Sequence, residues 1–237
     1  MGNAPEENKL SMAMENYLLS ILRLEEQSVV VTITKLAEHF KDLPKGEGLG
    51  TSVPSVSAML KRMAREKLVV TNSSKEINLT DIGRQSAESI LRRHRLAKKL
   101  VVDVLKVDLA QSHEEAHRLE HAISPYLENK IVDLLDNPTT CPFGHPIPGS
   151  SYKPKDGLLT LDKAKVGCSY IVDRLPEDDK ELLEYFVDNG FLPGVSFLVK
   201  DCSIPRGIVT LSCGENQLVF SVALSALIWV YQPSPRK

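Results

Sequence analysis

A proline-rich segment, residues 138–154, divides the chain into two stretches with different hydrophobic patterns. It holds five of the 14 prolines in the 237 residues, a density that helix interiors and central strands do not tolerate. Before it, apolar residues recur at helical spacing. After it, short β-type runs at 169–174, 195–200, 208–212 and 218–222 alternate with Gly, Pro and Asp turns. We therefore expect a mainly α protein with a small β domain.

The first 80 residues predict a winged helix-turn-helix. The predicted elements are helices at 10–26, 32–40 and 52–67 and β-prone runs at 68–71 and 76–79. Ser52 is placed to cap the third helix, and Pro54 lies in its first turn, where the missing N–H costs nothing. A polar tip between the two β-prone runs predicts a hairpin, the wing. A glycine-rich loop, 41–51, separates the second and third helices.

The third helix and the wing carry the residues that we expect to meet DNA. Small polar residues at the start of a recognition helix contact base edges and phosphates, and basic residues follow the phosphate backbone. Between residues 61 and 99 the chain has eleven Lys/Arg against four Asp/Glu, and between 100 and 140 three against eight. The alternative is a basic face that is merely solvated. The predicted DNA-binding residues are Ser52, Pro54, Ser55, Ser57, Lys61, Arg62 and Lys75.

Four metal-capable side chains lie at positions i, i+4, i+7 and i+8 of a helical stretch: His113, His117, Glu120 and His121. At helical spacing they share one face. Imidazoles with a carboxylate suit a divalent first-row metal ion. One alternative is an exposed histidine-rich face with no ligand. Another is catalytic, because residues 117–121 match H-x-x-E-H, a zinc peptidase motif in which the glutamate is the general base.

The cysteines predict neither disulfides nor a zinc knuckle. Cys141, Cys168, Cys202 and Cys213 lie far apart with no C-x-x-C pair. Turn chemistry explains Cys141 and His145 within the proline-rich segment, so we interpret both as structural. No apolar run approaches the length of a membrane span, and the first residues lack the basic flank of a signal peptide. We expect a cytoplasmic protein with no membrane partner.

Several of these segments together resemble the DtxR/MntR family of metal-dependent repressors. The resembling segments are 15–26, 52–57, 79–84, 93–97, 113–121 and 141–148, and in the last domain 181–194. The resemblance implies a winged helix-turn-helix in 1–80, a helical metal-binding and dimerisation domain in 81–150, a linker in 151–157 and an SH3-like, FeoA-type β-barrel in 158–237.

The resemblance also implies two neighbouring metal sites. The primary site would use Asn16, His117, Glu120 and His121; the ancillary site would use His94, His113 and Asp179. Lys98 stands where relatives have an acidic ligand, and an ammonium repels a divalent cation. We therefore expect Lys98 to pair with a carboxylate such as Asp179 and hold the barrel domain without a second metal.

The function that follows is a homodimeric repressor with Fe²⁺ or Mn²⁺ as corepressor, Zn²⁺ being chemically possible. It would bind a palindromic operator in double-stranded DNA and control genes of metal homeostasis. Two alternatives stay open at this stage: a zinc metallopeptidase that uses the H-x-x-E-H motif, and a protein-interaction module that does not bind DNA.

Overall fold

The computed structural model describes residues 10–42, 49–177 and 179–233. Most of the predicted 41–51 loop therefore lies outside the described residues. The chain forms two compact units, Met1–Arg92 and Arg93–Lys237. Across the described residues, no helix is both long and apolar enough to cross a membrane.

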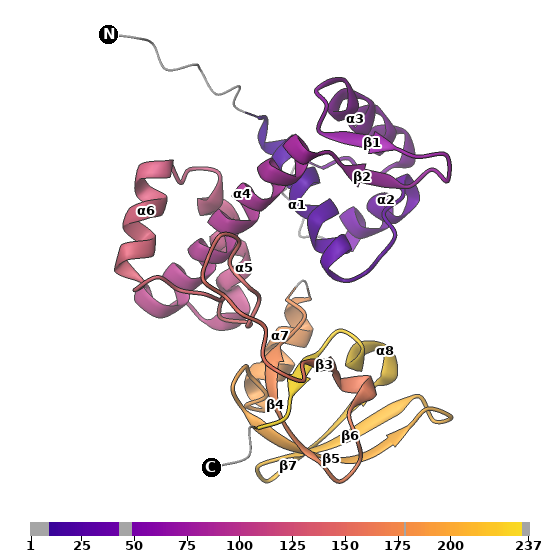
Figure 1. Cartoon of the computed structure of the whole chain (residues 1–237), viewed down its shortest axis with the longest axis vertical. Coiled ribbons are helices and arrows are strands. Elements are labelled where there is room, and N and C mark those ends of the chain that lie inside the picture. The colour runs from indigo at the N-terminus through magenta and orange to yellow at the C-terminus, as the bar shows by residue number, and fades with distance from the viewer. Residues whose placement is uncertain (1–9, 43–48, 178, 234–237) are drawn as a thin grey trace. The chain divides into compact units, whose positions relative to one another are not determined.

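The first unit is a winged helix-turn-helix, as predicted (Figure 1). Its elements are α1 (Met12–Glu26), α2 (Ile33–Asp42), α3 (Val53–Arg65), β1 (Val69–Thr71), β2 (Ile77–Leu79) and the first part of α4 (Asp81–Lys99). Ser52 caps α3 by accepting a hydrogen bond from the backbone N–H of Ser55 (3.3 Å), which satisfies one of the free donors of the first turn. Strands β1 and β2 pair antiparallel, from Val69 opposite Leu79 to Thr71 opposite Ile77.

The core of the first unit lies between α1 and the other helices. Tyr17, Leu18 and Ile21 of α1 are at most 1% exposed. They belong to the same apolar cluster as Leu36 of α2 and Met63 of α3. This is the inner stripe that the helical periodicity predicts, and its burial holds α3 in place with its opposite face in solvent.

The second unit begins with the rest of α4 and a π-helical turn at Leu100–Val104. Helices α5 (Ser112–Glu120) and α6 (Pro125–Leu134) follow. Leu96 and Ala97 of α4, Ala116 of α5 and Ile131 of α6 share one apolar cluster. Residues 93–136 are called the helical domain below. The cluster fixes α5 against α4, which determines where the histidines of both helices meet.

The β domain is one six-stranded antiparallel sheet in the order β3-β8-β4-β5-β6-β7. The strands are β3 (Leu159–Thr160), β4 (Ser169–Arg174), β5 (Ser196–Ser203), β6 (Ile208–Cys213), β7 (Asn216–Ser221) and β8 (Trp229–Tyr231); the helices are α7 (Lys180–Asp188) and α8 (Val222–Ser225). In Figure 1, α7 lies beside the strands, and its Phe186 contacts the rings of Phe191 and Phe220 at 5.9 Å between centroids.

The proline-rich segment packs into the cores of two domains and is more than a linker. Cys141 and Phe143 are buried in the core of the β domain, whereas Ile147 joins the core of the helical domain. Gly144 lies at φ +86°, and a Cβ there would stand 1.9 Å from the carbonyl oxygen of Asp173. Only glycine permits this close approach at a positive φ. Residues 139–148 therefore attach one domain to the other.

Candidate metal centre and nucleic-acid interface

Glu120, at the end of α5, is fully buried and surrounded by imidazoles. Its Oε1 lies 2.9 Å from Nδ1 of His117 and 3.3 Å from Nε2 of His121. Its other oxygen, Oε2, contacts Nδ1 of His94 on α4. Because Glu120 is three positions after His117 and one before His121, the local spacing brings these three together, whereas His94 arrives through the packing of α4 on α5.

His117, Glu120 and His121 form a group able to hold a metal ion. Each offers a ligand atom, and these atoms all lie within 4.8 Å of one another. Two imidazole nitrogens and a carboxylate oxygen suit several first-row divalent ions. Glu114 and Glu115 point elsewhere and pair with the exposed Arg118, as expected for solvated residues of the same helix.

His94 and His113, expected at a separate ancillary site, lie together. Their ring centroids are 5.3 Å apart in an edge-to-face arrangement, and His94 also contacts Glu120. The Glu120 carboxylate thus contacts His117 and His121 through one oxygen and His94 through the other. We call Glu120 and these four histidines the Glu120 cluster.

Arg93 is a residue of this site that the sequence reasoning missed. Its Nε donates to the backbone carbonyl oxygen of Glu120 (3.1 Å), which ties the end of α5 to α4 and so fixes the cluster. No local pattern marks it, because its partner lies 27 positions along the chain.

The other predicted ligands belong to different surroundings. Asn16 lies on the buried side of α1 in the first unit, 2% exposed. Asp179 caps α7, its Oδ1 accepting from the backbone N–H of Leu182 (3.0 Å). Lys98 does pair with a carboxylate of the β domain, but the partner is Glu177 (2.7 Å) rather than Asp179. The reason is that Asp179 stands at a helix N-terminus, where its carboxylate serves the free N–H groups of its own helix.

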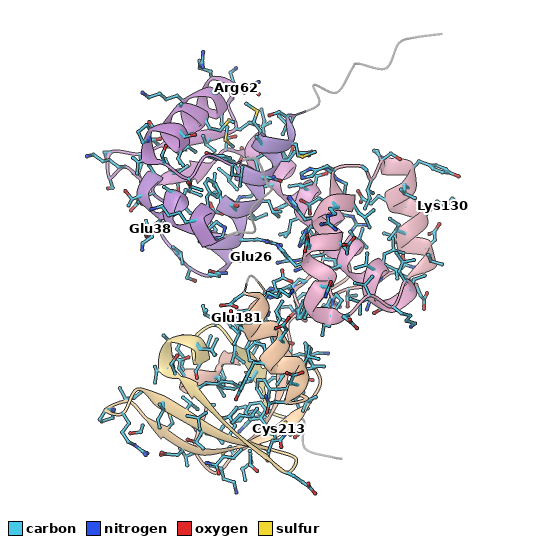
Figure 2. The ribbon with its side chains drawn as sticks, turned by 180° about the vertical axis from the view of Figure 1, so that it is seen from behind. Glu26, Glu38, Arg62, Lys130, Glu181 and Cys213 are labelled. Carbon is cyan, nitrogen blue, oxygen red and sulfur yellow. The ribbon has the colours of Figure 1, made fainter. Side chains whose placement is uncertain are left out.

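The predicted DNA-binding residues lie together on α3 and at the wing. Ser52, Pro54, Ser55, Lys61, Arg62 and Lys75 are exposed, and Ser57 is half-buried. Arg62 stands on the outer side of α3 (Figure 2) and pairs with Glu66 (3.3 Å). Lys75 adopts φ 63° in the wing turn. The exposed polar start of α3 and its basic outer side form a surface that suits the phosphates and base edges of a major groove.

Three family models match consecutive parts of the chain. Residues 9–77 match the N-terminal DNA binding domain of iron dependent repressors, residues 80–149 their metal binding and dimerisation domain, and residues 159–232 the FeoA domain. The matched order is that of the winged helix, the helical domain and the β domain.

Relatives and solved structures agree with these models. The iron-dependent repressor IdeR of Mycobacterium tuberculosis is 34% identical over 217 residues, 86% of this chain and 90% of that protein. The diphtheria toxin repressor of Corynebacterium diphtheriae is 37% identical over 135 residues, 57% of this chain and 56% of that one.

Among solved structures, a manganese-dependent transcriptional repressor in complex with manganese is 27% identical, with a TM-score of 0.80 over 93% of this chain and 100% of that one. ScaR with bound Cd²⁺ is 26% identical, with a TM-score of 0.79 over 93% of this chain and 99% of that one. The predicted family is thereby confirmed: the chain belongs to the DtxR/MntR family of metal-dependent, DNA-binding transcriptional repressors, whose members dimerise and are not enzymes.

Proposed function

We propose that the corepressor is Fe²⁺ or Mn²⁺ and that it binds at the Glu120 cluster. The observation that carries the proposal is the buried Glu120 carboxylate, whose side-chain contacts among the described residues are all imidazole nitrogens. Imidazole nitrogens are common metal ligands, and a buried carboxylate is stabilised by a positive charge beside it. A divalent ion supplies that charge when bound, and the residues fit it in number and chemistry.

The ligand set proposed for the primary site is His117, Glu120, His121 and Asn16. The first three belong to the second unit and Asn16 to the first, so a shared metal ion would favour one arrangement of two otherwise separate bodies. Binding energy that differs between arrangements shifts the population toward the favoured one. A coupling of about 1–3 kcal/mol between metal and DNA, roughly 5- to 150-fold in affinity, suffices for a switch. His94 contacts the same carboxylate and His113 lies beside His94. We propose both as ligands of a neighbouring ancillary position, with Asp179 the less direct candidate.

The metal's identity rests on chemistry that several ions share. The described cluster offers nitrogen and oxygen and no sulfur, which suits Fe²⁺, Mn²⁺ and Zn²⁺ alike. The relatives' names point to iron and the structural neighbours' to manganese. ScaR has also been solved with Zn²⁺, so zinc is the second candidate.

The proposed DNA-bound form is a dimer on a palindromic operator. A two-fold dimer separates its recognition helices by about 34 Å, one turn of the duplex. Exposed apolar side chains on α6 support a contact with a second copy: Tyr126, Leu127 and Leu134 are 74%, 45% and 61% exposed. The regulated genes would serve metal homeostasis, and the protein would work in the cytoplasm, where a bacterial operator lies.

The H-x-x-E-H match favours metal binding over peptide hydrolysis in this setting. A general base must face a metal-bound water and a substrate cleft. Glu120 instead is fully buried and directs both oxygens at imidazoles, which is how a ligand or a ligand's partner is placed. Anaerobic peptidase assays with Zn²⁺ should therefore show no activity that depends on Glu120.

The experiment that tests the function is fluorescence anisotropy of a palindromic fragment from the gene's own upstream region. It would be titrated anaerobically at fixed salt with Fe²⁺, Mn²⁺, Zn²⁺ or chelator. We expect affinity to rise roughly 5- to 150-fold with one of the first two ions relative to chelator. Equal affinity under all four conditions would overturn the corepressor role, and no binding under any would favour an interaction module.

A recognition-helix variant sharpens the same assay. If Lys61 contacts a phosphate, Lys61→Ala should weaken binding to all sequences similarly and reduce the slope of log affinity against log salt by about 1. Lys155→Ala, an exposed lysine of the second unit outside the proposed interface, serves as the control with an unchanged slope. An unchanged slope in Lys61→Ala would remove this residue from the interface.

A further inference from the structure

A lysine is buried where the helical domain meets the β domain. Lys98, one residue before the end of α4, is 0% exposed, and its Nζ lies 2.7 Å from Oε2 of Glu177, which is 4% exposed. The two residues are 79 positions apart. This ion pair therefore joins α4 to the connection that precedes α7, with both charges removed from water.

The proline-rich segment completes the same cluster from a third direction. The Cys141 thiol donates to the same Oε2 of Glu177, with 3.7 Å between sulfur and oxygen. The Phe143 ring lies 5.3 Å from Lys98 Nζ, within the range of a cation–π contact. One turn earlier on α4, Arg95 Nη1 donates to the carbonyl oxygen of Pro146 (2.6 Å). The carboxylate thus accepts from two donors, and α4 is tied to the segment at two points.

The chemistry of this cluster differs from that of a metal centre. A buried carboxylate needs a cation and hydrogen-bond donors, and Lys98 and Cys141 supply both from within the chain. An ammonium within hydrogen-bond distance also repels any divalent ion that would approach the same oxygen. Because every partner is covalently part of the chain, the balance of charge here does not depend on metal concentration.

We propose that Lys98, Glu177 and Cys141 form a permanent, metal-independent lock that holds the FeoA-type β domain on the helical domain. The cation that fixes this domain is a lysine ammonium rather than a metal ion. Metal dependence is then confined to the Glu120 cluster, and the β domain stays attached at every metal level. The lock does not require that the Glu120 cluster be the corepressor site.

The thiol of Cys141 reports directly on whether the lock is closed. The full-length protein would be pulse-labelled with iodoacetamide under native conditions, and the rate at Cys141 read by peptide mass spectrometry. The peptides with the half-buried Cys168 and Cys202 serve as internal references. We expect the same slow labelling of Cys141 with chelator and with saturating Mn²⁺. Labelling that is slow with Mn²⁺ and fast with chelator would overturn the proposal, because the domain would then be held by metal.

Variants test whether the ion pair is the cause of the protection. Removing one partner of a buried pair leaves the other charge uncompensated, so Lys98→Met should speed labelling of Cys141 by roughly 100-fold. The matched control is Lys99→Met, which removes the neighbouring, partly exposed pair with Asp103 and should change the rate by less than about 5-fold. Equal rates in the two variants would refute the lock.

A double variant separates a lock from generally weakened folding. In Lys98→Met/Glu177→Leu both charges are gone, and apolar replacement of a whole buried pair is often neutral, so protection of Cys141 should return most of the way. If protection of Cys141 does not return in the double variant, Lys98 and Glu177 do not act together as a pair. If Lys98→Met does not fold, Glu177→Gln keeps an acceptor for Lys98 and should give intermediate labelling; wild-type labelling there would count against the lock.

DNA binding distinguishes this proposal from the proposed function. Anisotropy on the same samples should keep its metal dependence whatever the labelling of Cys141 shows. Loss of that dependence in wild-type protein would refute the corepressor site and leave the lock standing.

Discussion

Two buried carboxylates of the second unit, Glu120 and Glu177, have opposite surroundings. Glu120 faces His94, His117 and His121, whereas Glu177 faces the ammonium of Lys98 and the thiol of Cys141. The imidazoles beside the first carboxylate are groups that can also bind a metal ion, whereas the second carboxylate is paired with an ammonium of the chain itself. If the two proposals hold, one fold uses a buried carboxylate in two ways: with a metal ion as a switch, and with a lysine of the chain as a permanent attachment.

The largest expected effect is on stability, when the ammonium that pairs with Glu177 is removed. Lys98→Met should lower the free energy of unfolding by about 3–5 kcal/mol, the usual cost of leaving one member of a buried pair alone. Chemical denaturation with chelator and with saturating Mn²⁺ would measure it. Metal bound to the folded state adds stability by mass action, but the difference between variant and wild type should be the same in both conditions. A difference that disappears with Mn²⁺ would mean that metal and lysine hold the same site.

The second largest expected effect concerns Glu120, the carboxylate that faces imidazoles. Glu120→Gln should abolish the metal-dependent gain in DNA affinity, a loss of up to about 3 kcal/mol of coupling. Without metal its stability should stay near that of wild type or rise, since the substitution removes a buried charge and leaves an amide that can still hydrogen-bond the imidazoles. Anisotropy with and without metal measures the change in DNA affinity, and denaturation in chelator measures the metal-free stability. Glu115→Gln, exposed on the same helix, is the control. A metal-free loss as large as that of Lys98→Met would erase the contrast between the clusters.

The sequence predicted the local part of the Glu120 cluster and missed the tertiary part. His117, Glu120 and His121 lie within one helical turn, so their spacing alone predicts that they meet. The winged helix was predicted from the cap at Ser52, the helical spacing of apolar residues and the two β-prone runs that follow. The contact of His94 with Glu120 depends on how α4 packs on α5, which no local pattern encodes.

The lock formed by Lys98, Glu177 and Cys141 was even harder to predict from local sequence patterns. A lysine in a helix normally predicts a solvated position, and its burial is set by residues 79 positions away. Only the comparison with an acidic ligand in relatives drew attention to Lys98, and it indicated Asp179 as the partner. The position of α7 decides the role of Asp179, which caps that helix, whereas Glu177, two positions earlier, meets the lysine.

The smallest expected effect is a pH dependence of the free energy of unfolding that arises at the lock. Burial, and then the charge of Glu177, raise the pKa of the Cys141 thiol from 9.0 to about 11. The folded state therefore keeps the thiol proton where the unfolded state loses it. This contribution to stability is fully present below pH 9 and is lost as the pH rises through about 11. Between pH 8 and 10.5 the free energy of unfolding should fall by about 2 kcal/mol from this group.

Cys141→Ala tests that contribution, because the two proteins differ only in this side chain. Denaturation of the two proteins at pH 8 and pH 10.5 should show wild type losing about 2 kcal/mol more than the variant over this interval. The loss should be unaffected by Mn²⁺, since neither the thiol nor its carboxylate partner belongs to the Glu120 cluster. If both proteins lose the same stability, the thiol is not held protonated by its surroundings.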